Sequence, residues 1–269
     1  MSTTDLHIQE NLATWLSPFF DDDTKKTITE LQKTNLEELN DSFYKNLEFG
    51  TGGMRGVMGV GTNRINKYTL GKNTQGLSNY LHQTYANQPI KVVIAFDCRH
   101  NSKSFAKIVA DVFSANGIEV FLFEDLRATP ELSFALKHLG CQCGIVLTAS
   151  HNPPEYNGYK VYWEDGGQLV PPFDGEIINL INSLEYTDIN FSAKEELIHL
   201  IGKDVDDVFI NAAVKNGSLE VNSSASRENL SVVFTALHGT SITAVPETLK
   251  RAGYTNVHLV EQQSVPDGD

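Results

Sequence analysis

The sequence predicts an α/β fold: a three-layer α/β/α domain with a mixed sheet, preceded by N-terminal helices and followed by a second, incomplete domain of similar type. Short runs rich in β-branched and aromatic residues alternate with amphipathic stretches of helix length, and the connections carry Gly, Asn or Pro. The 269 residues are 41% hydrophobic and 20% charged, a globular composition that excludes disordered, collagen-like and coiled-coil proteins.

The first predicted unit is a helical segment, residues 1–48. Apolar residues at helical spacing run through residues 6–16, 27–36 and 39–47. We expect this segment to pack on the domain that follows it.

Residues 49–189 are predicted to form the main α/β domain. Ser102 and Pro130 stand where helices favour a capping residue or a first-turn proline. The Glu-Asp-Gly-Gly sequence at 164–167 predicts a β-hairpin turn. The expected strands are residues 92–96, 120–123 and 144–147, and the expected helices are residues 69–85, 102–115, 130–139 and 174–184.

Residues 190–269 are predicted to form the second α/β domain, after a polar linker at 187–193. Two clear strands are fewer than a self-sufficient sheet usually needs, so we expect this domain to be incomplete. Its expected helices are residues 205–214 and 244–252, and its expected strands are residues 230–237 and 256–260.

The charge balance is acidic, with 21 Lys and Arg against 34 Asp and Glu and a net charge of −13 at pH 7. Binding to a nucleic-acid backbone needs a basic stripe, which the sequence lacks, so no nucleic-acid partner is expected. No apolar run reaches the ~20 residues of a membrane span, and the N-terminus does not resemble a signal peptide. Three cysteines are too few for a disulfide framework. We therefore expect no membrane association and a cytoplasmic location.

The strongest chemical signal is residues 148–168, TASHNPPEYNGYKVYWEDGGQ. An apolar strand leads Ser150 and His151 into a loop where two prolines prevent a helix, and ligands of open α/β sheets bind at such strand ends. Ser150 is a hydroxyl nucleophile, and His151 beside it could move a proton. Asn152 adds an amide donor, and Lys160 adds a cation from the next strand. These groups suit phosphoryl transfer, although a capped turn without catalytic function explains them equally well.

Residues 49–56, FGTGGMRG, form a second motif. Its glycines permit positive φ and close backbone approach, so its N–H groups could surround an anion with Arg55 above it. The motif is neither a dinucleotide-binding fingerprint nor a P-loop. Taken alone, such a glycine-rich loop is more often structural than functional.

Together the two motifs resemble the α-D-phosphohexomutase superfamily, which contains the phosphoglucomutases and phosphomannomutases. The first resembles the phosphoserine loop of that family, and the second resembles its glycine-rich signature with an active-site arginine. The resemblance covers about residues 40–269. It corresponds to the first domain and most of the second domain of a four-domain enzyme.

The resemblance implies that Ser150 is phosphorylated in the resting enzyme and transfers its phosphoryl group to a hexose monophosphate. Asp97-Cys98-Arg99 resembles the Asp-x-Arg segment of the family, in which we expect Asp97 to be structural. The implied catalytic residues are Ser150, His151, Arg55 and Lys160, and the implied substrate- or phosphate-binding residues are Asn152 and Arg99.

The resemblance also implies Mg²⁺ as cofactor and glucose 1,6-bisphosphate as activator. The metal loop of the family carries three aspartates, whereas Asp267-Gly-Asp269 offers two carboxylates after a proline. Ser150, through its phosphate or its Oγ, is therefore the one metal ligand that we assign. The remaining ligands are expected beyond residue 269.

These inferences predict a phosphohexomutase, an isomerase of carbohydrate metabolism that acts as an intramolecular phosphotransferase. It would interconvert hexose 1-phosphate and hexose 6-phosphate through a phosphoserine enzyme and a bisphosphate intermediate. We expect an N-terminal fragment, inactive alone, whose partners are the hexose phosphate and the missing C-terminal domains of the same chain. Two alternatives stay open: a phosphohydrolase that uses Ser150 as phosphocarrier, or a non-catalytic sugar-phosphate-binding fragment. The sugar, whether glucose, mannose or pentose, is not encoded in these residues.

Overall fold

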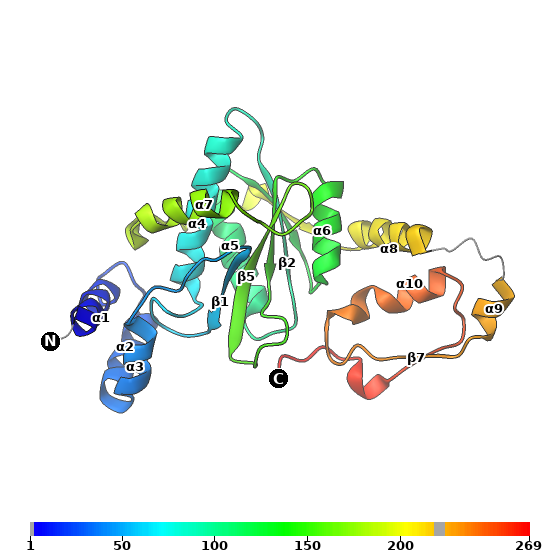
Figure 1. Ribbon diagram of the computed structural model, residues 1–269, viewed down its shortest axis with the longest axis horizontal. Coiled ribbons are helices and arrows are strands. Elements are labelled where there is room, and N and C mark those ends of the chain that lie inside the picture. The colour runs from blue at the N-terminus through cyan, green and yellow to red at the C-terminus, as the bar shows by residue number, and fades with distance from the viewer. Residues whose placement is uncertain (1–2, 218–223) are drawn as a thin grey trace.

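The computed structural model describes residues 3–217 and 224–269, and its centre is a mixed sheet covered by helices on both faces (Figure 1). The strand order is β1-β5-β4-β2-β3-β6. β5 runs antiparallel to β1 and β4, whereas the β4–β2, β2–β3 and β3–β6 pairs are parallel. This arrangement confirms the predicted mixed-sheet α/β class. The strands are β1 Gly53–Val57, β2 Lys91–Phe96, β3 Glu119–Phe123, β4 Cys143–Leu147, β5 Tyr156–Trp163 and β6 Ile198–Ile201.

Two apolar cores lie on opposite faces of this sheet. α4 (Lys67–Thr84), α5 (Ser102–Ala115) and α7 (Phe173–Ser183) contribute to one core, and α6 (Thr129–His138) and α8 (Lys203–Gly217) contribute to the other. β2 serves both, because successive side chains of a strand point to opposite faces. Val92, Ile94 and Phe96 enter the first core, and Val93 and Ala95 enter the second. Burial on both faces explains why the central strands are continuous apolar runs.

The helices expected before residue 48 are present as α1 (Thr3–Trp15), α2 (Asp22–Thr34) and α3 (Leu36–Phe43). They enclose a small aromatic core of their own around Trp15, which is fully buried. Tyr68 of α4 joins this core, with its ring centroid 5.5 Å from that of Trp15. The Tyr68 hydroxyl also donates to the carboxylate of Asp21 that caps α2, so Tyr68 joins the helical segment to α4 by packing and by a hydrogen bond.

β6 extends the sheet beyond the boundary that we expected at residue 190. It pairs in parallel with β3, and no strand was predicted there because the run is four residues long and lies at the sheet edge, where Leu200 stays 68% exposed.

The polar linker predicted at 187–193 is also packed on the first domain. Ile189 is buried, and the Asn190 N–H donates to the side chain of Gln75 on α4. The polar residues there bond to the domain rather than separate it from the next.

The second unit follows β6 and lies to one side of the sheet (yellow to red in Figure 1). In its described part, β7 and β8 form a two-stranded parallel sheet. Both strands are shorter than predicted, and Val233 at the centre of β7 is 72% exposed. No helix in the described ranges is long and apolar enough to cross a membrane. The elements of the second unit after α8 are α9 Ser224–Asn229, β7 Val232–Phe234, α10 Val245–Arg251 and β8 Val257–Leu259.

A buried charge cluster joins α6 to α8. Nε and Nη2 of Arg127 donate to the two carboxylate oxygens of Asp206 at 2.7 and 2.8 Å. Glu131 is 1% exposed, and neither of its carboxyl oxygens has a hydrogen-bond partner in the described part of the chain. Burial, followed by the neighbouring Asp206 carboxylate, raises the pKa of Glu131 to about 8. The Arg127 guanidinium therefore pairs with Asp206, its Nε lies 3.9 Å from Glu131 Oε1, and Glu131 is protonated at neutral pH.

The contact of β1 with β5 leaves no room for a side chain at two positions. Gly53 has φ +129°, and a Cβ there would lie 1.9 Å from the carbonyl oxygen of Tyr159. A Cβ on Gly158 would lie 2.7 Å from the carbonyl oxygen of Thr148 and 2.9 Å from that of Met54. These two glycines let β1 lie against β5 in the register that pairs Gly53 with Lys160.

We predict that Gly53→Ala lowers the free energy of unfolding by about 2 kcal/mol or more, because the added methyl meets backbone in a conformation that side chains rarely adopt. Gly175→Ala is the matched control, since the space around Gly175 in α7 is open and a helix gains from alanine. Urea denaturation of both variants tests this. Equal stability of the two variants would contradict the prediction.

Glu131→Gln is predicted to flatten the pH dependence of stability. Because the pKa of Glu131 is raised in the folded state from 4.5 to about 8, its contribution is full below pH ~4.5 and is lost as the pH rises through about 8. The wild-type free energy of unfolding should therefore fall by up to about 5 kcal/mol across that window. Denaturation from pH 5 to 9 measures it, with Glu30→Gln on exposed α2 as the control that keeps the wild-type slope.

Candidate active site

The candidate site is built on the loop between β4 and β5, at the carboxyl end of a central strand, which is the usual ligand position in open α/β sheets. Ser150 in this loop is exposed and has φ +55°, a left-handed conformation that is uncommon for a residue with a side chain. Its N–H donates to Oγ1 of the buried Thr148 at 3.0 Å. The turn therefore presents the serine hydroxyl to solvent at the end of the strand.

Lys160 on β5 reaches this hydroxyl, with Nζ 2.9 Å from Ser150 Oγ. The register of β1 against β5 pairs Gly53 with Lys160 and Arg55 with Gly158, so the two cations are diagonal neighbours on one face. Burial, followed by the charge of Arg55, lowers the pKa of Lys160. The ammonium of Lys160 therefore releases its proton more readily than that of an ordinary lysine.

Arg55 is exposed and holds the loop from the side, donating from Nη1 to Asn152 Oδ1 at 2.7 Å. That bond places a guanidinium and an amide next to the serine. The predicted group of Ser150, Lys160, Arg55 and Asn152 is thus brought together. His151 is exposed and lies outside the residues that line the adjacent cavity.

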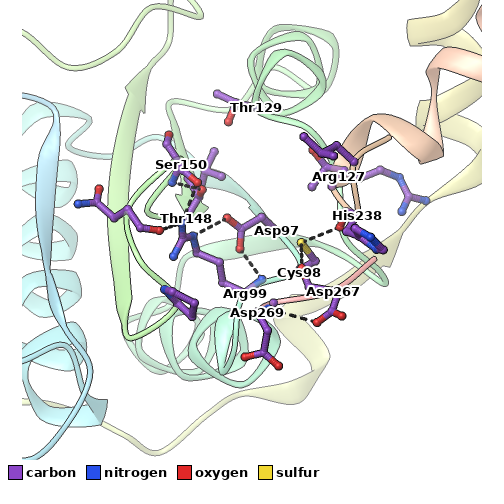
Figure 2. A pocket seen from close by; sticks show the side chains of 17 residues that line it. Asp97, Cys98, Arg99, Arg127, Thr129, Thr148, Ser150, His238, Asp267 and Asp269 are labelled. Carbon is purple, nitrogen blue, oxygen red and sulfur yellow. Dashed lines mark hydrogen bonds and ion pairs between the residues drawn. The ribbon is translucent and has the colours of Figure 1, made fainter. Parts of the chain in front are cut away.

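Arg99, expected from the resemblance to bind phosphate, faces the backbone of the loop (Figure 2). Its Nε lies 3.7 Å from the Asp97 carboxylate, which also accepts the Arg99 backbone N–H at 3.0 Å. Its terminal nitrogens donate to the carbonyl oxygens of Ser150, Asn152, Pro153 and Tyr156.

A cavity of about 440 Å³ opens beside Ser150, and both units form its walls (Figure 2). The Cys98 thiol donates to the carbonyl oxygens of His238 and Asp267 at 3.3 and 3.2 Å, which closes one side. Burial, followed by the charge of Asp97, raises the pKa of Cys98, so this thiol stays protonated. The first unit contributes Asp97, Cys98, Arg99, Arg127, Thr129, Val146, Thr148, Ser150, Asn152 and Pro154, and the second contributes Leu237, His238, Gly239, Thr240, Asp267, Gly268 and Asp269.

Residues 235–240, TALHGT, resemble a segment of the same superfamily and were predicted to lie in the core. That prediction was wrong, because Leu237, His238, Gly239 and Thr240 line the cavity. His238 follows β7 as Cys98 follows β2, so both residues stand at strand ends, where ligands of α/β sheets bind. Leu237 and His238 both have positive φ, at +46° and +61°. The sequence does not predict positive φ at these positions, because leucine and histidine do not favour that conformation.

The described residues offer a magnesium ion little besides Ser150. Within residues 3–217 and 224–269, no group of three or more His, Cys, Asp or Glu side chains is placed to hold a metal ion. The Asp269 carboxylate lies 2.7 Å from Nε2 of His100, and the Asp267 carboxylate accepts the backbone N–H of Asp269. The oxygen of Ser150 is exposed and close to the cavity, as a phosphate-bridged cation would require.

Comparison with known proteins places these residues in context. The family described as phosphoglucomutase/phosphomannomutase, alpha/beta/alpha domain I, matches residues 46–188, and domain II of the same family matches residues 207–269. A phosphoglucomutase of Staphylococcus epidermidis is 38% identical over 239 residues, covering 87% of this chain and 42% of that protein. A phosphoglucomutase of Staphylococcus aureus is 39% identical over 240 residues, covering 88% and 42%. The chain thus spans less than half the length of these relatives.

Among solved structures, a phosphoglucomutase/phosphomannomutase family protein from Burkholderia thailandensis superimposes with a TM-score of 0.61. The alignment covers 81% of this chain and 44% of that one, at 22% sequence identity. At that identity the likeness shows the fold alone, and it agrees with the layered α/β architecture described above.

Proposed function

The chain belongs to the phosphoglucomutase/phosphomannomutase family, and on that premise we propose that it supplies the phosphoserine domain of a mutase that interconverts hexose 1-phosphate and hexose 6-phosphate. The observation that carries this proposal is the exposed Ser150 hydroxyl at the end of β4, 2.9 Å from the ammonium of Lys160. A serine and a lysine so placed can exchange a proton as a phosphoryl group arrives or leaves.

Ser150 carries the phosphoryl group, and the reaction consists of two transfers. In the first, a substrate hydroxyl attacks the phosphorus and releases its proton to solvent, the bond between Ser150 Oγ and phosphorus breaks, and Lys160 gives its proton to Oγ. In the second, Oγ attacks the other phosphate of the hexose bisphosphate and passes its proton to Lys160, and the sugar oxygen that leaves takes up a proton from solvent. The lowered pKa of Lys160 suits it to both directions. The bisphosphate left by the first transfer becomes the isomeric monophosphate.

Arg55 donates to Asn152 Oδ1 at 2.7 Å, so a guanidinium and an amide lie beside the loop two residues after Ser150. Charge on the transferring group spreads over its outer oxygens, so a fixed guanidinium and amide stabilise it without reorganisation. We assign His151 a supporting role at the exposed surface of the loop. Magnesium, when bound through the Ser150 phosphate, would neutralise part of the same charge.

The first test is covalent. Incubation of the full-length mutase with glucose 1,6-bisphosphate should add one phosphate, because the Ser150 hydroxyl is exposed and has a proton acceptor beside it. Ser150→Ala should take up none, and Ser104→Ala, at an exposed serine of α5, should behave as wild type. Intact-protein mass spectrometry measures the addition. Phosphate that persists in Ser150→Ala would refute the assignment.

The second test removes the cations. Arg55→Ala and Lys160→Ala should each lower kcat of the full-length mutase by ~10²–10³, the usual effect of losing one preorganised donor. Lys33→Ala, on the exposed surface of α2, is the control and should leave kcat unchanged. A coupled assay of glucose 1-phosphate turnover gives kcat. Release of inorganic phosphate at the rate of turnover would instead support a phosphohydrolase.

A further inference from the structure

The loop that carries Ser150 has few internal bonds for the conformation that it holds. Two of its residues are prolines, which have no N–H to donate. The Asn152 N–H donates to Ala149 O at 3.1 Å, and the Tyr156 N–H donates to Pro153 O at 3.0 Å. The left-handed φ of Ser150 is a strained conformation, and such conformations persist when the surroundings impose them.

Arg99 supplies most of the hydrogen bonds that hold the carbonyl groups of the loop. Its Nη1 donates to two loop carbonyls at 2.9 and 3.1 Å, and its Nη2 donates to two more, one of them Ser150 O at 2.8 Å. Those carbonyls belong to residues spread over positions 150–156. A planar guanidinium with a fixed fork can serve four acceptors at once, whereas an ammonium has three donors on a flexible stem.

Four of the five N–H groups of the guanidinium are hydrogen-bonded to the loop, and the fifth, on Nε, faces the Asp97 carboxylate at 3.7 Å. The Arg99 side chain is 10% exposed. Binding a phosphoryl group through Arg99 would require breaking bonds that hold the loop.

Arg99 itself is anchored at the junction of β2 and α5. Asp97 Oδ1 accepts the hydroxyl of Ser102 at 2.8 Å as well as the Arg99 N–H. The buried Asn157 of β5 donates to the Ser102 hydroxyl at 2.9 Å and to His100 O at 3.0 Å. The backbone that carries Arg99 is therefore fixed to β2, α5 and β5, and it does not move with the loop.

We propose that Arg99 is a positioning residue: its guanidinium holds the Ser150 loop in the left-handed conformation that aims Oγ at Lys160, and it does not contact the transferring phosphoryl group. The part of this inference that concerns phosphoryl transfer rests on the proposed function. Without the guanidinium, Ser150 relaxes and Oγ moves away from Lys160. A displacement of about 1 Å at a reacting atom can cost ~10²-fold in rate.

Arg99→Lys tests the inference, with Arg64→Lys as the matched control. Arg64 is also buried and also donates to a carboxylate and to backbone carbonyls, but it joins α3 to the segment before α4. In Arg99→Lys we expect the amides of residues 150–156 to exchange hydrogen at least ~10-fold faster than in wild type, with exchange elsewhere in the sheet unchanged. In Arg64→Lys, exchange of residues 150–156 should equal that of wild type.

Steady-state kinetics of the full-length mutase supply the second readout. Arg99→Lys should lower kcat by ~10²-fold while KM stays within about threefold, because the loop is misplaced and the substrate contacts remain. The fall in Tm should not exceed that of Arg64→Lys. A KM raised about tenfold with kcat unchanged would show that Arg99 binds substrate, and it would overturn the proposal. Unchanged exchange of residues 150–156 would overturn it as well.

Asp97→Asn keeps the test decisive if Arg99→Lys does not fold. The amide oxygen can still accept from Ser102, whereas the ion pair to Nε is lost, so exchange of the loop and kcat should change in the same directions by a smaller factor. If neither the hydrogen exchange of the loop nor kcat changes, the positioning role of Arg99 is refuted. Hydrogen exchange needs no turnover. If wild-type Ser150 accepts no phosphate, the proposed function fails while the exchange comparison still decides the role of Arg99.

Discussion

The close antiparallel packing of β5 between β1 and β4 is the constraint on which the site depends. Gly53 and Gly158 permit it, because a Cβ at either position would meet the backbone of a neighbouring strand. The resulting register places Arg55 and Lys160 diagonally on one face, next to the loop that leaves β4. Had the strands been further apart, neither cation would reach that loop. The glycine-rich motif thus acts through its lack of side chains as much as through its arginine.

Two cations on one face change the chemistry of the serine beside them. The chain as a whole carries a net charge of −13, yet the immediate neighbours of the Ser150 hydroxyl and of the Asn152 amide are an ammonium and a guanidinium. Partial burial, with the charge of Arg55, makes the ammonium of Lys160 easier to deprotonate. A locally basic site in an acidic protein attracts a small anion to this loop without attracting polyanions to the rest of the surface.

The second unit completes the cavity instead of lying apart from it. It contacts the first through the Arg127–Asp206 pair at α6 and α8, and through the carbonyls that accept the Cys98 thiol. Both contacts lie beyond the carboxyl ends of the strands of the first sheet. The buried carboxyl of Glu131 beside that pair makes this junction sensitive to its protonation state. The geometry of the cavity therefore depends on how the two units meet, as well as on the loop.

The helices of the first domain, the strands β2, β3 and β4 and the serine loop could all be predicted from the sequence, whereas β1 was expected as a glycine-rich loop. They depend on local properties: a strand buried on both faces is a continuous apolar run, and a serine before two prolines is visible in one segment. Three features needed the tertiary structure. β6 is too short and too exposed to give a recognisable strand pattern in the sequence. The Arg99 guanidinium serves carbonyls 51 to 57 positions away, and the Cys98 thiol meets a carbonyl 140 positions away. Every residue has the same backbone carbonyl group, so the sequence does not show which carbonyls accept these hydrogen bonds. Those acceptors determine the roles of the Arg99 and Cys98 side chains.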